Sequence, residues 1–178
     1  VLLAFAPVLA GAATFTVTNT SDSDAGSLRL ALVSANASVG THTIAFAIPG
    51  AGPHTITLAS PLPTITRAVT IDGFSQPGSQ PNTRTPAQGG LDARPMIELS
   101  GGGTVATLLS VSHASVDAAV IRGLVLNRAS FGIVSTNQGP VRVEGCFIGT
   151  DTSGTTVPVP MQAGLQVVGN VTIGGTAP

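Results

Sequence analysis

Several short stretches in the first half of the chain alternate apolar and polar positions, and this alternation predicts β-strands. The predicted strands span residues 14–20, 43–48, 55–58 and 69–71. In the second of them Ile44, Phe46 and Ile48 fall on one face. Because successive side chains of a strand point to opposite faces, such a face is expected to line a core.

The segment LRLALVSANA, between the first two predicted strands, has the spacing of a helix instead. Leu28, Leu32 and Ala35 recur at intervals of three and four residues. Ser27 is a suitable N-cap before them, and Gly40 ends the segment. The helix is nearly apolar all round, so we expect it to lie against a core.

Short apolar runs separated by glycine recur in the second half of the chain. They occupy residues 97–99, 120–126, 132–134, 141–149 and 164–175. Gly123 and Gly145 are 22 residues apart, and Gly169 follows after another 24. Self-similarity at this interval predicts an all-β solenoid, a parallel β-helix, in which stacked turns share one core. The helix would then cover one end of the coil, whose strand edges otherwise invite aggregation.

Residues 75–95 form a long stretch rich in Pro, Gly and Gln without any periodicity. Loops of this length inside compact domains are functional or flexible. The expected organisation is a signal-peptide remnant at 1–13, an N-terminal cap with the first turns of the coil at 14–98, and further repeats at 99–178.

Both ends of the sequence suggest a piece of a longer protein. The first 13 residues, VLLAFAPVLAGAA, are an apolar run that ends in small residues, as at a signal-peptidase site. The run is too short to span a bilayer, which takes about 20 residues. The alternative is an ordinary first strand, against which Pro7 counts. The last residues, GGTAP, directly follow a predicted strand, so we expect truncation there and a mature chain outside the cytoplasm.

The segment 16–36, TVTNTSDSDAGSLRLALVSAN, resembles the opening of bacterial exported right-handed β-helix proteins with a CSLREA-type N-terminal region. Further similar motifs are TIAF at 43–46, LPTI at 62–65, TIDG at 70–73, SQPG at 75–78, IRGL at 121–124, FIGTD at 147–151 and IGGT at 173–176. The sequence departs from the family pattern at Asp24, where Gly is common, and at Leu30, where Glu or Gln is common. The resemblance implies a pectin-lyase-like, right-handed parallel β-helix in a bacterial protein that is secreted or at the cell surface.

The composition narrows the possible functions. Charged residues are 8% of the chain, Lys is absent, and the formal net charge is -1, so the chain lacks the basic face that nucleic acid requires. Hydrophobic residues are 43%, which argues against intrinsic disorder. Cys146 is the single cysteine and excludes an internal disulfide framework. We expect it to be buried and inert; the alternative is a bond to a cysteine elsewhere in a longer protein.

The acidic residues offer the main candidate chemistry. Glycoside hydrolysis needs two carboxyl groups about 5–10 Å apart, and Asp72, Glu98 and Glu144 follow strand cores at similar positions, so they could stack. The alternative is a polar corner or a solvated face. Asp22 and Asp24 lack a third calcium ligand, and we expect them to cap the helix or its turn and to pair with Arg29.

The remaining polar and aromatic residues point to no specific site. Arg122 and Arg142 occupy matching places in successive turns, and a row of Arg would attract anions. The histidines His42, His54 and His113 are too far apart in sequence for a local metal site. We expect His42 and His54, which flank strands, to be turn residues. All the aromatic residues are Phe, and we expect Phe15, Phe46 and Phe147 to face inward, which weakens a sugar-stacking function.

The sequence therefore predicts a secreted or cell-surface β-helix protein with a structural or adhesive role. No catalytic, cofactor-binding or metal-binding residue is assigned, and no cofactor is expected. The expected partners are cell-surface or extracellular polysaccharides or proteins, with no nucleic acid and no membrane span in the mature segment. The alternative is a polysaccharide-degrading enzyme, a lyase or a glycosidase.

Overall fold

The computed structural model describes residues 11–136 and 139–174, which form short strands and one α-helix. The helix is α1 (Leu28–Ala37), and two 3₁₀ turns span Gly73–Ser75 and Pro86–Gln88. The strands are β1 (Thr14–Val17), β2 (His42–Phe46), β3 (His54–Thr57), β4 (Val69–Asp72), β5 (Ile97–Ser100), β6 (Thr107–Val111), β7 (Ala119–Arg122), β8 (Leu124–Asn127), β9 (Phe131–Ser135), β10 (Val141–Glu144), β11 (Phe147–Ile148), β12 (Ala163–Val167) and β13 (Val171–Ile173).

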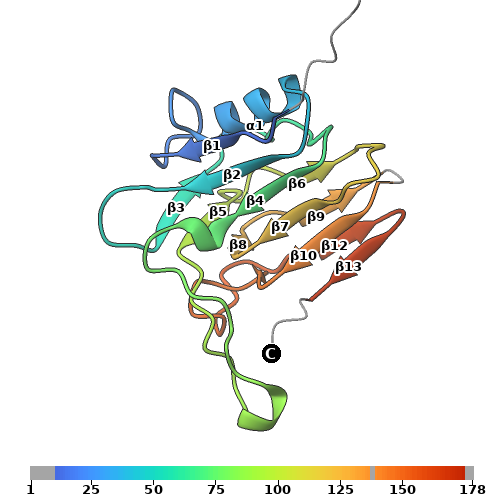
Figure 1. The fold of residues 1–178 in the computed structure, drawn as a ribbon. Coiled ribbons are helices and arrows are strands. Elements are labelled where there is room, and N and C mark those ends of the chain that lie inside the picture. The colour runs from blue at the N-terminus through green and yellow to red at the C-terminus, as the bar shows by residue number, and fades with distance from the viewer. Residues whose placement is uncertain (1–10, 137–138, 175–178) are drawn as a thin grey trace, which may run out of the picture.

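The strands form three sheets in which every neighbouring pair is parallel (Figure 1). The first sheet has six strands in the order β1-β2-β4-β7-β10-β13. The second has four in the order β11-β8-β5-β3, and the third has three in the order β12-β9-β6. Short strands in parallel sheets need crossover connections, and here each crossover leads through another sheet or through α1.

This arrangement corrects the expected fold class. The chain does not form the single right-handed parallel β-helix solenoid predicted from the glycine spacing: it forms three separate parallel sheets of unequal size and one helix. The intervals between neighbouring strands of the first sheet are 29, 27, 50, 22 and 30 residues, so the regular spacing of 22–24 residues read from the glycines is not kept. The intervals follow from the register pairs Phe15–Ile44, Ile44–Ile71, Ile71–Ile121, Ile121–Val143 and Val143–Ile173.

The three sheets share one apolar core. Ile44, Ile71 and Ile121 align in one ladder of the first sheet and are fully buried. Leu99 of the second sheet and Ile133 of the third belong to the same buried cluster. The alternation read from the sequence thus identified inward-facing positions correctly, although the assembly differs from the expected one.

Helix α1 closes one end of this core, beside β1 and β2 (Figure 1). Leu28 and Leu32 are fully buried, while Leu30 and Val33 on the other side are 46% and 48% exposed. The side chain of Ser27 accepts a hydrogen bond from the N–H of Leu30, as expected for the N-cap. The predicted helix is confirmed, but only one side of it is buried.

Three of the predicted apolar runs each hold two strands. The run 120–126 is divided into β7 and β8 at Gly123, whose φ of 67° lies in the left-handed region that favours glycine. The run 141–149 likewise holds β10 and β11, and the run 164–175 holds β12 and β13. Strand β6 was not predicted, although its sequence TLLSV is largely apolar.

The interpretations of the two ends fall mainly outside the described residues. Residues 1–10, most of the expected signal-peptide remnant, and residues 175–178 are not described. Within the described ranges, no helix combines the length and the apolar character needed to cross a bilayer.

Candidate functional site

Residues 76–95 project from the body of the molecule between β4 and β5, and we call them the arm (Figure 1). The long aperiodic stretch predicted from the sequence is confirmed as a connection without strands. Its contacts with the body and within itself give it a defined shape.

Just before the arm, the ring of Phe74 lies against two glycines. Asp72 accepts a hydrogen bond of 3.1 Å from the N–H of Phe74, which fixes the turn after β4. A Cβ atom added to Gly123 would lie 2.7 Å from the Phe74 ring, and one added to Gly145 would lie 2.8 Å from it. The ring therefore lies directly on the backbone of the next two strand ends, where only glycine leaves room.

Gln76 ties the arm to the neighbouring turn. Its Oε1 accepts a hydrogen bond of 2.9 Å from the N–H of Ile48, and its Nε2 donates one of 2.8 Å to the carbonyl of Ile48. Gln76 is 2% exposed. Ser75 adds an acceptor for the N–H of Phe46 at 2.7 Å. A buried amide that satisfies both backbone groups of one residue acts like an additional strand pairing.

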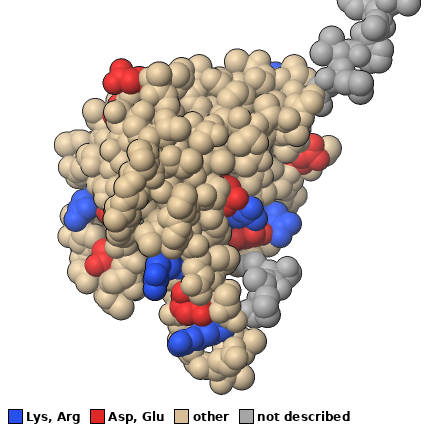
Figure 2. Space-filling view, turned by 60° about the vertical axis from the view of Figure 1, so that its left-hand side comes forward, with Lys and Arg blue, Asp and Glu red and all other residues tan. Residues whose placement is uncertain are grey.

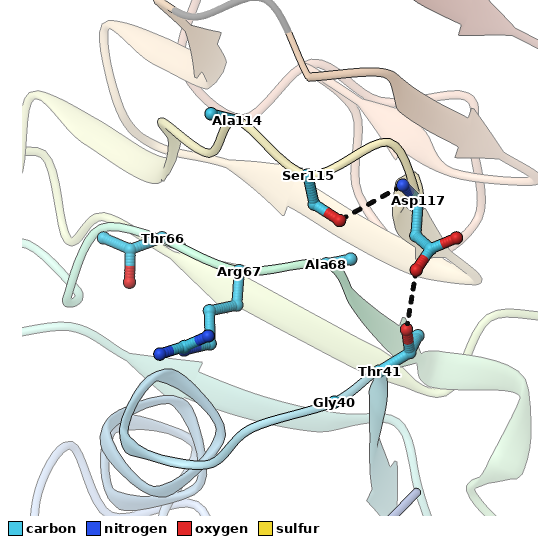
Figure 3. A pocket seen from close by; sticks show the side chains of 8 residues that line it. All are labelled: Gly40, Thr41, Thr66, Arg67, Ala68, Ala114, Ser115 and Asp117. Carbon is cyan, nitrogen blue, oxygen red and sulfur yellow. Dashed lines mark hydrogen bonds between the residues drawn. The ribbon is translucent and has the colours of Figure 1, made fainter. Parts of the chain in front are cut away.

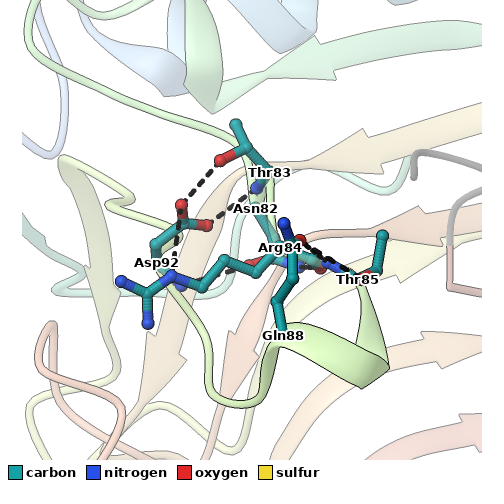
Figure 4. A network of polar contacts seen from close by, with 6 residues as sticks. All are labelled: Asn82, Thr83, Arg84, Thr85, Gln88 and Asp92. Carbon is teal, nitrogen blue, oxygen red and sulfur yellow. Dashed lines mark hydrogen bonds and ion pairs between the residues drawn. The ribbon is translucent and has the colours of Figure 1, made fainter.

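The two halves of the arm are joined at its neck and at its tip. Gln80 and Arg94 exchange backbone hydrogen bonds of 3.0 and 2.7 Å. Closer to the tip, Asp92 accepts bonds of 2.7 and 2.6 Å from the N–H and the hydroxyl of Thr83 (Figure 4). These bonds lower the pKa of Asp92 below its usual value, because they stabilise the ionised carboxylate.

The three acids that were expected to stack are only partly aligned. Asp72 and Glu144 fall in one ladder of the first sheet, but Arg122 lies between them. The guanidinium of Arg122 donates hydrogen bonds of 2.9 and 2.7 Å to the two oxygens of Asp72. These bonds raise the pKa of Arg122. Glu144 pairs with Arg142 at 2.7 Å. Both carboxylates thus serve as counter-charges of arginine.

The expected row of Arg122 and Arg142 is wrong. The register places Arg122 opposite Glu144, and it places Arg142 opposite Val120. The two arginines are therefore offset by two residues across the strands, and each forms an ion pair with an acid. The spacing along the sequence did not reveal this offset, because it does not fix the register between strands.

Glu98 lies in the second sheet, away from the Asp72 ladder. Its carboxylate accepts bonds from Thr55 at 2.9 Å, from Asn127 at 2.8 Å and from Arg128 at 3.3 Å. Asn127 is fully buried and also donates to the carbonyl of Thr150. This network joins three neighbouring strand positions and leaves the Glu98 carboxylate fully engaged.

A pocket of about 320 Å³ opens where three turns precede strands of the first sheet (Figure 3). On one side Asp117 accepts a hydrogen bond of 3.3 Å from the hydroxyl of Thr41. On another side Arg67 donates to the carbonyl of Asn36, near the end of α1. Both charged groups are exposed, so the pocket is a shallow polar hollow.

The acids before the helix, Asp22 and Asp24, were expected to cap it and to pair with Arg29. Arg29 pairs with Asp22 at 2.6 Å and holds the carbonyls of Ser60 and Pro61, so Asp22 serves the arginine and the N-cap is Ser27. Asp24 has a φ of 87°, which explains why Gly suits this position.

Two histidines and one phenylalanine lie elsewhere than expected. His42 and His54 are not turn residues, because they begin β2 and β3. His42 is 2% exposed and packs edge-on against Phe15. Phe147 is buried outside the shared core, where its ring lies against Gly154. Phe46 faces the core as predicted.

Cys146 is a free cysteine with its sulfur 3.6 Å from the carbonyl oxygen of Ile121. Burial raises the pKa of its thiol to about 11. The expected buried position is confirmed for the sulfur, although part of the residue reaches the surface.

Charges are sparse on the surface, and most of them belong to ion pairs. On the face drawn in Figure 2, several arginine and acidic side chains lie beside one another, while other acidic side chains stand alone within an uncharged surface. Among the described residues, no group of three or more His, Cys, Asp or Glu side chains could hold a metal ion.

Comparisons of the chain with models of protein families, with curated proteins and with solved structures found no match. The resemblance of the segment 16–36 to exported bacterial proteins therefore stays a prediction.

Proposed function

We propose that this chain is an extracytoplasmic binding protein with a structural or adhesive role, and that the arm makes the contact with its partner. The parallel sheets form the base, and the arm carries the contact surface away from it. The observation that carries the proposal is that the arm projects and is nevertheless held at its base, neck and tip by specific bonds.

Such an arrangement suits binding because a shaped segment loses little conformational entropy when a partner docks. The partner expected from the sequence is a polysaccharide or a protein of the cell surface or extracellular space. Support for the location comes from the apolar segment 1–13 and from the resemblance at 16–36.

The carboxylates favour binding over glycoside hydrolysis. Hydrolysis requires one carboxyl group that holds a proton and a second that is available to the substrate. Asp72, Glu98 and Glu144 are each engaged by an arginine. Partners occupy both oxygens of Asp72 and of Glu98 and one oxygen of Glu144, which a substrate would need.

The outer part of the arm can be removed while the backbone pairing of Gln80 with Arg94 is kept. Because Gln80 and Arg94 pair across the neck, residues 81–93 can be replaced by Asn-Gly, a two-residue hairpin turn. Wild type and this variant are compared on immobilised pectin, alginate, xylan, collagen and fibronectin by surface plasmon resonance. We expect wild type to bind at least one surface and the shortened variant to bind it at least tenfold more weakly.

A matched control changes an exposed residue far from the arm. Val116→Ala alters a side chain that is 93% exposed, and it should bind like wild type. Equal binding by wild type and the shortened variant, or no binding to any surface, contradicts the proposal. Turnover of pectin, alginate or xylan that Asp72→Asn abolishes would instead establish the enzymatic alternative.

A further inference from the structure

Two side chains of opposite charge, Arg67 and Asp117, line the pocket of about 320 Å³ at the turns that precede β2, β4 and β7. Figure 3 shows the guanidinium of Arg67 on the side of α1 and the carboxylate of Asp117 on the opposite side of the pocket. Within the described ranges, neither group forms an ion pair with the other or with a third side chain. Both charges are therefore available to a ligand that enters the pocket.

An unpaired arginine is an exception in this molecule. The seven basic residues are all arginines, and five of them form an ion pair with an acid. Among the described residues, Arg67 and Arg94 form none, and Arg94 lies on the arm. A cation and an anion that line one pocket without neutralising each other are complementary to a molecule that carries both charges.

The end of α1 fixes the guanidinium of Arg67. Its Nε donates a hydrogen bond of 2.9 Å to the carbonyl of Asn36 in the last turn of the helix. The side chain of Asn36 is itself bonded to the carbonyl of Thr64 and to the N–H of Thr66, at 2.7 and 3.0 Å. The two Nη groups of Arg67 have no hydrogen-bond partner among the described residues. Their N–H donors match the two oxygens of a carboxylate.

The carboxylate of Asp117 is fixed from the opposite side of the pocket. Its Oδ2 accepts a hydrogen bond of 3.3 Å from the hydroxyl of Thr41, and its backbone N–H donates one of 3.1 Å to the hydroxyl oxygen of Ser115. Its Oδ1 has no partner in the part of the chain that the structure describes. An ammonium group, which has three donors, can bind this oxygen.

We propose that the pocket binds a small zwitterion of the amino-acid or short-peptide class, whose carboxylate binds Arg67 and whose ammonium group binds Asp117. A ligand with a single charge would leave one of the two side chains without a counter-charge, so both charges of the ligand contribute to binding. Because both side chains are exposed and their charges are screened by solvent, we expect dissociation constants of about 1 mM.

The pocket lies apart from the arm. Strands β2, β4 and β7 are parallel neighbours, so their first residues lie along one side of the first sheet. The pocket is at this side, whereas the arm follows the other end of β4. The proposal therefore does not rest on the function proposed for the arm.

The test is a titration of the full chain with glycine, diglycine and triglycine up to about 20 mM, followed by NMR chemical shifts of the backbone amides. The three ligands carry the same two charges at increasing separation. We expect at least one of them to shift the amides of Thr41, Arg67 and Asp117 in a saturable way. The N-acetylated form of that ligand lacks the ammonium group and its C-terminal amide lacks the carboxylate, and each should bind at least fivefold more weakly.

Substitutions identify the side chain that recognises each charge. Arg67→Gln should weaken binding at least fivefold and should no longer distinguish the ligand from its C-terminal amide. Asp117→Asn, which keeps an acceptor for Thr41, should weaken binding equally and should no longer distinguish the ligand from its N-acetylated form. The matched controls Arg94→Gln and Asp24→Asn remove an exposed charge of each sign outside the pocket, and both should bind like wild type.

Circular dichroism and the melting temperature verify that the variants fold, and the comparison of the three ligand forms on wild type is decisive even if one of them does not. The absence of a saturable shift with all three ligands would overturn the proposal. Equal binding of the ligand and its two derivatives, or equal weakening in the control variants, would overturn it as well.

Discussion

Gly123 leaves room for the ring of Phe74 at the base of the arm, because it has no side chain. Its φ is 67° and a Cβ atom there would meet the ring of Phe74. Gly50 has a comparable φ of 96° but nothing within 4 Å of an added Cβ atom. The two glycines therefore separate backbone strain from the loss of the Phe74 contact.

We predict that Gly50→Ala lowers the free energy of unfolding by about 1 kcal/mol, the cost of a left-handed backbone for Ala. Gly123→Ala should lower it by about 3 kcal/mol, because the ring of Phe74 must also move. Chemical denaturation measures both values. Equal losses in the two variants would show that the ring does not depend on Gly123.

The thiol of Cys146 should be unreactive in the native protein. Its pKa of about 11 leaves almost no thiolate at pH 8, and the thiolate is the reactive form. We predict slow alkylation by iodoacetamide at pH 8 and rapid alkylation in guanidinium chloride, measured by mass spectrometry. Rapid alkylation of the folded protein would contradict the burial of the sulfur.

The same pKa fixes a pH dependence. The pKa of the thiol is raised from 9.0 to about 11 in the folded protein. The stability that the buried neutral thiol contributes is therefore fully present below pH 9. This contribution is lost as the pH rises from 9 to 11. Cys146→Ser should show a smaller loss of stability over that window than wild type.

Residue contacts were predictable from the sequence where they are local. The N-cap bond of Ser27 and the ion pair of Arg29 with Asp22 join residues close together in the sequence, and both were predicted. Asp72 and Arg122 are far apart in sequence and meet only because β4 pairs with β7. Without the register, no sequence signal distinguishes this pair from any other acid and base.

At the scale of elements, α1 offers a direct test of the covered core end. Leu32→Ala removes a fully buried side chain and should cost about 2–5 kcal/mol of unfolding free energy. Val33→Ala changes the next residue, which is 48% exposed, and should cost less than about 0.5 kcal/mol. Similar losses in the two variants would mean that α1 does not seal the core.

Deletion of residues 27–37 should have a stronger effect than either substitution. It exposes β1 and the core beneath the helix, and exposed strand edges promote aggregation. We predict that the deletion variant aggregates, which light scattering detects. A soluble, folded monomer would show that the helix is dispensable.

The tip of the arm should lose order in acid. Hydrogen bonds from Thr83 hold the pKa of Asp92 below its usual value of 3.8. Their contribution is present above pH 3.8 and is lost as the pH falls through the lower native pKa. Amide signals of residues 82–92 should shift in NMR spectra below that pH. Thr83→Val should raise the pH of the transition, whereas Thr85→Val, whose hydroxyl binds Gln88, should not.

The types of most elements followed from local patterns, but their pairing did not. Alternation gave β2 and β3, and helical spacing gave α1, because each pattern reflects one buried face. Strand β6 was missed because TLLSV has two buried residues in succession at Leu108 and Leu109, which breaks the alternation.

For the whole molecule, the sequence was sufficient for parallel strands around a shared core and insufficient for the assembly of the sheets. The spacing of Gly123 and Gly145 reflects a real register between β7 and β10. Gly169 does not continue it, because β10 pairs with β13 through Val141 and Val171. Regular spacing at two positions was therefore a poor guide to the remaining sheets, and the arm was recognisable only as a stretch without a pattern.

The function proposed for the arm requires a shaped contact surface that is held on the sheets. The most direct measurement of this property is ¹⁵N relaxation of the backbone amides of residues 80–94. We predict order parameters close to the value of about 0.85 of rigid backbone, as in β4 and β5. Values below about 0.6 along the arm, with rigid strands beside it, would contradict it.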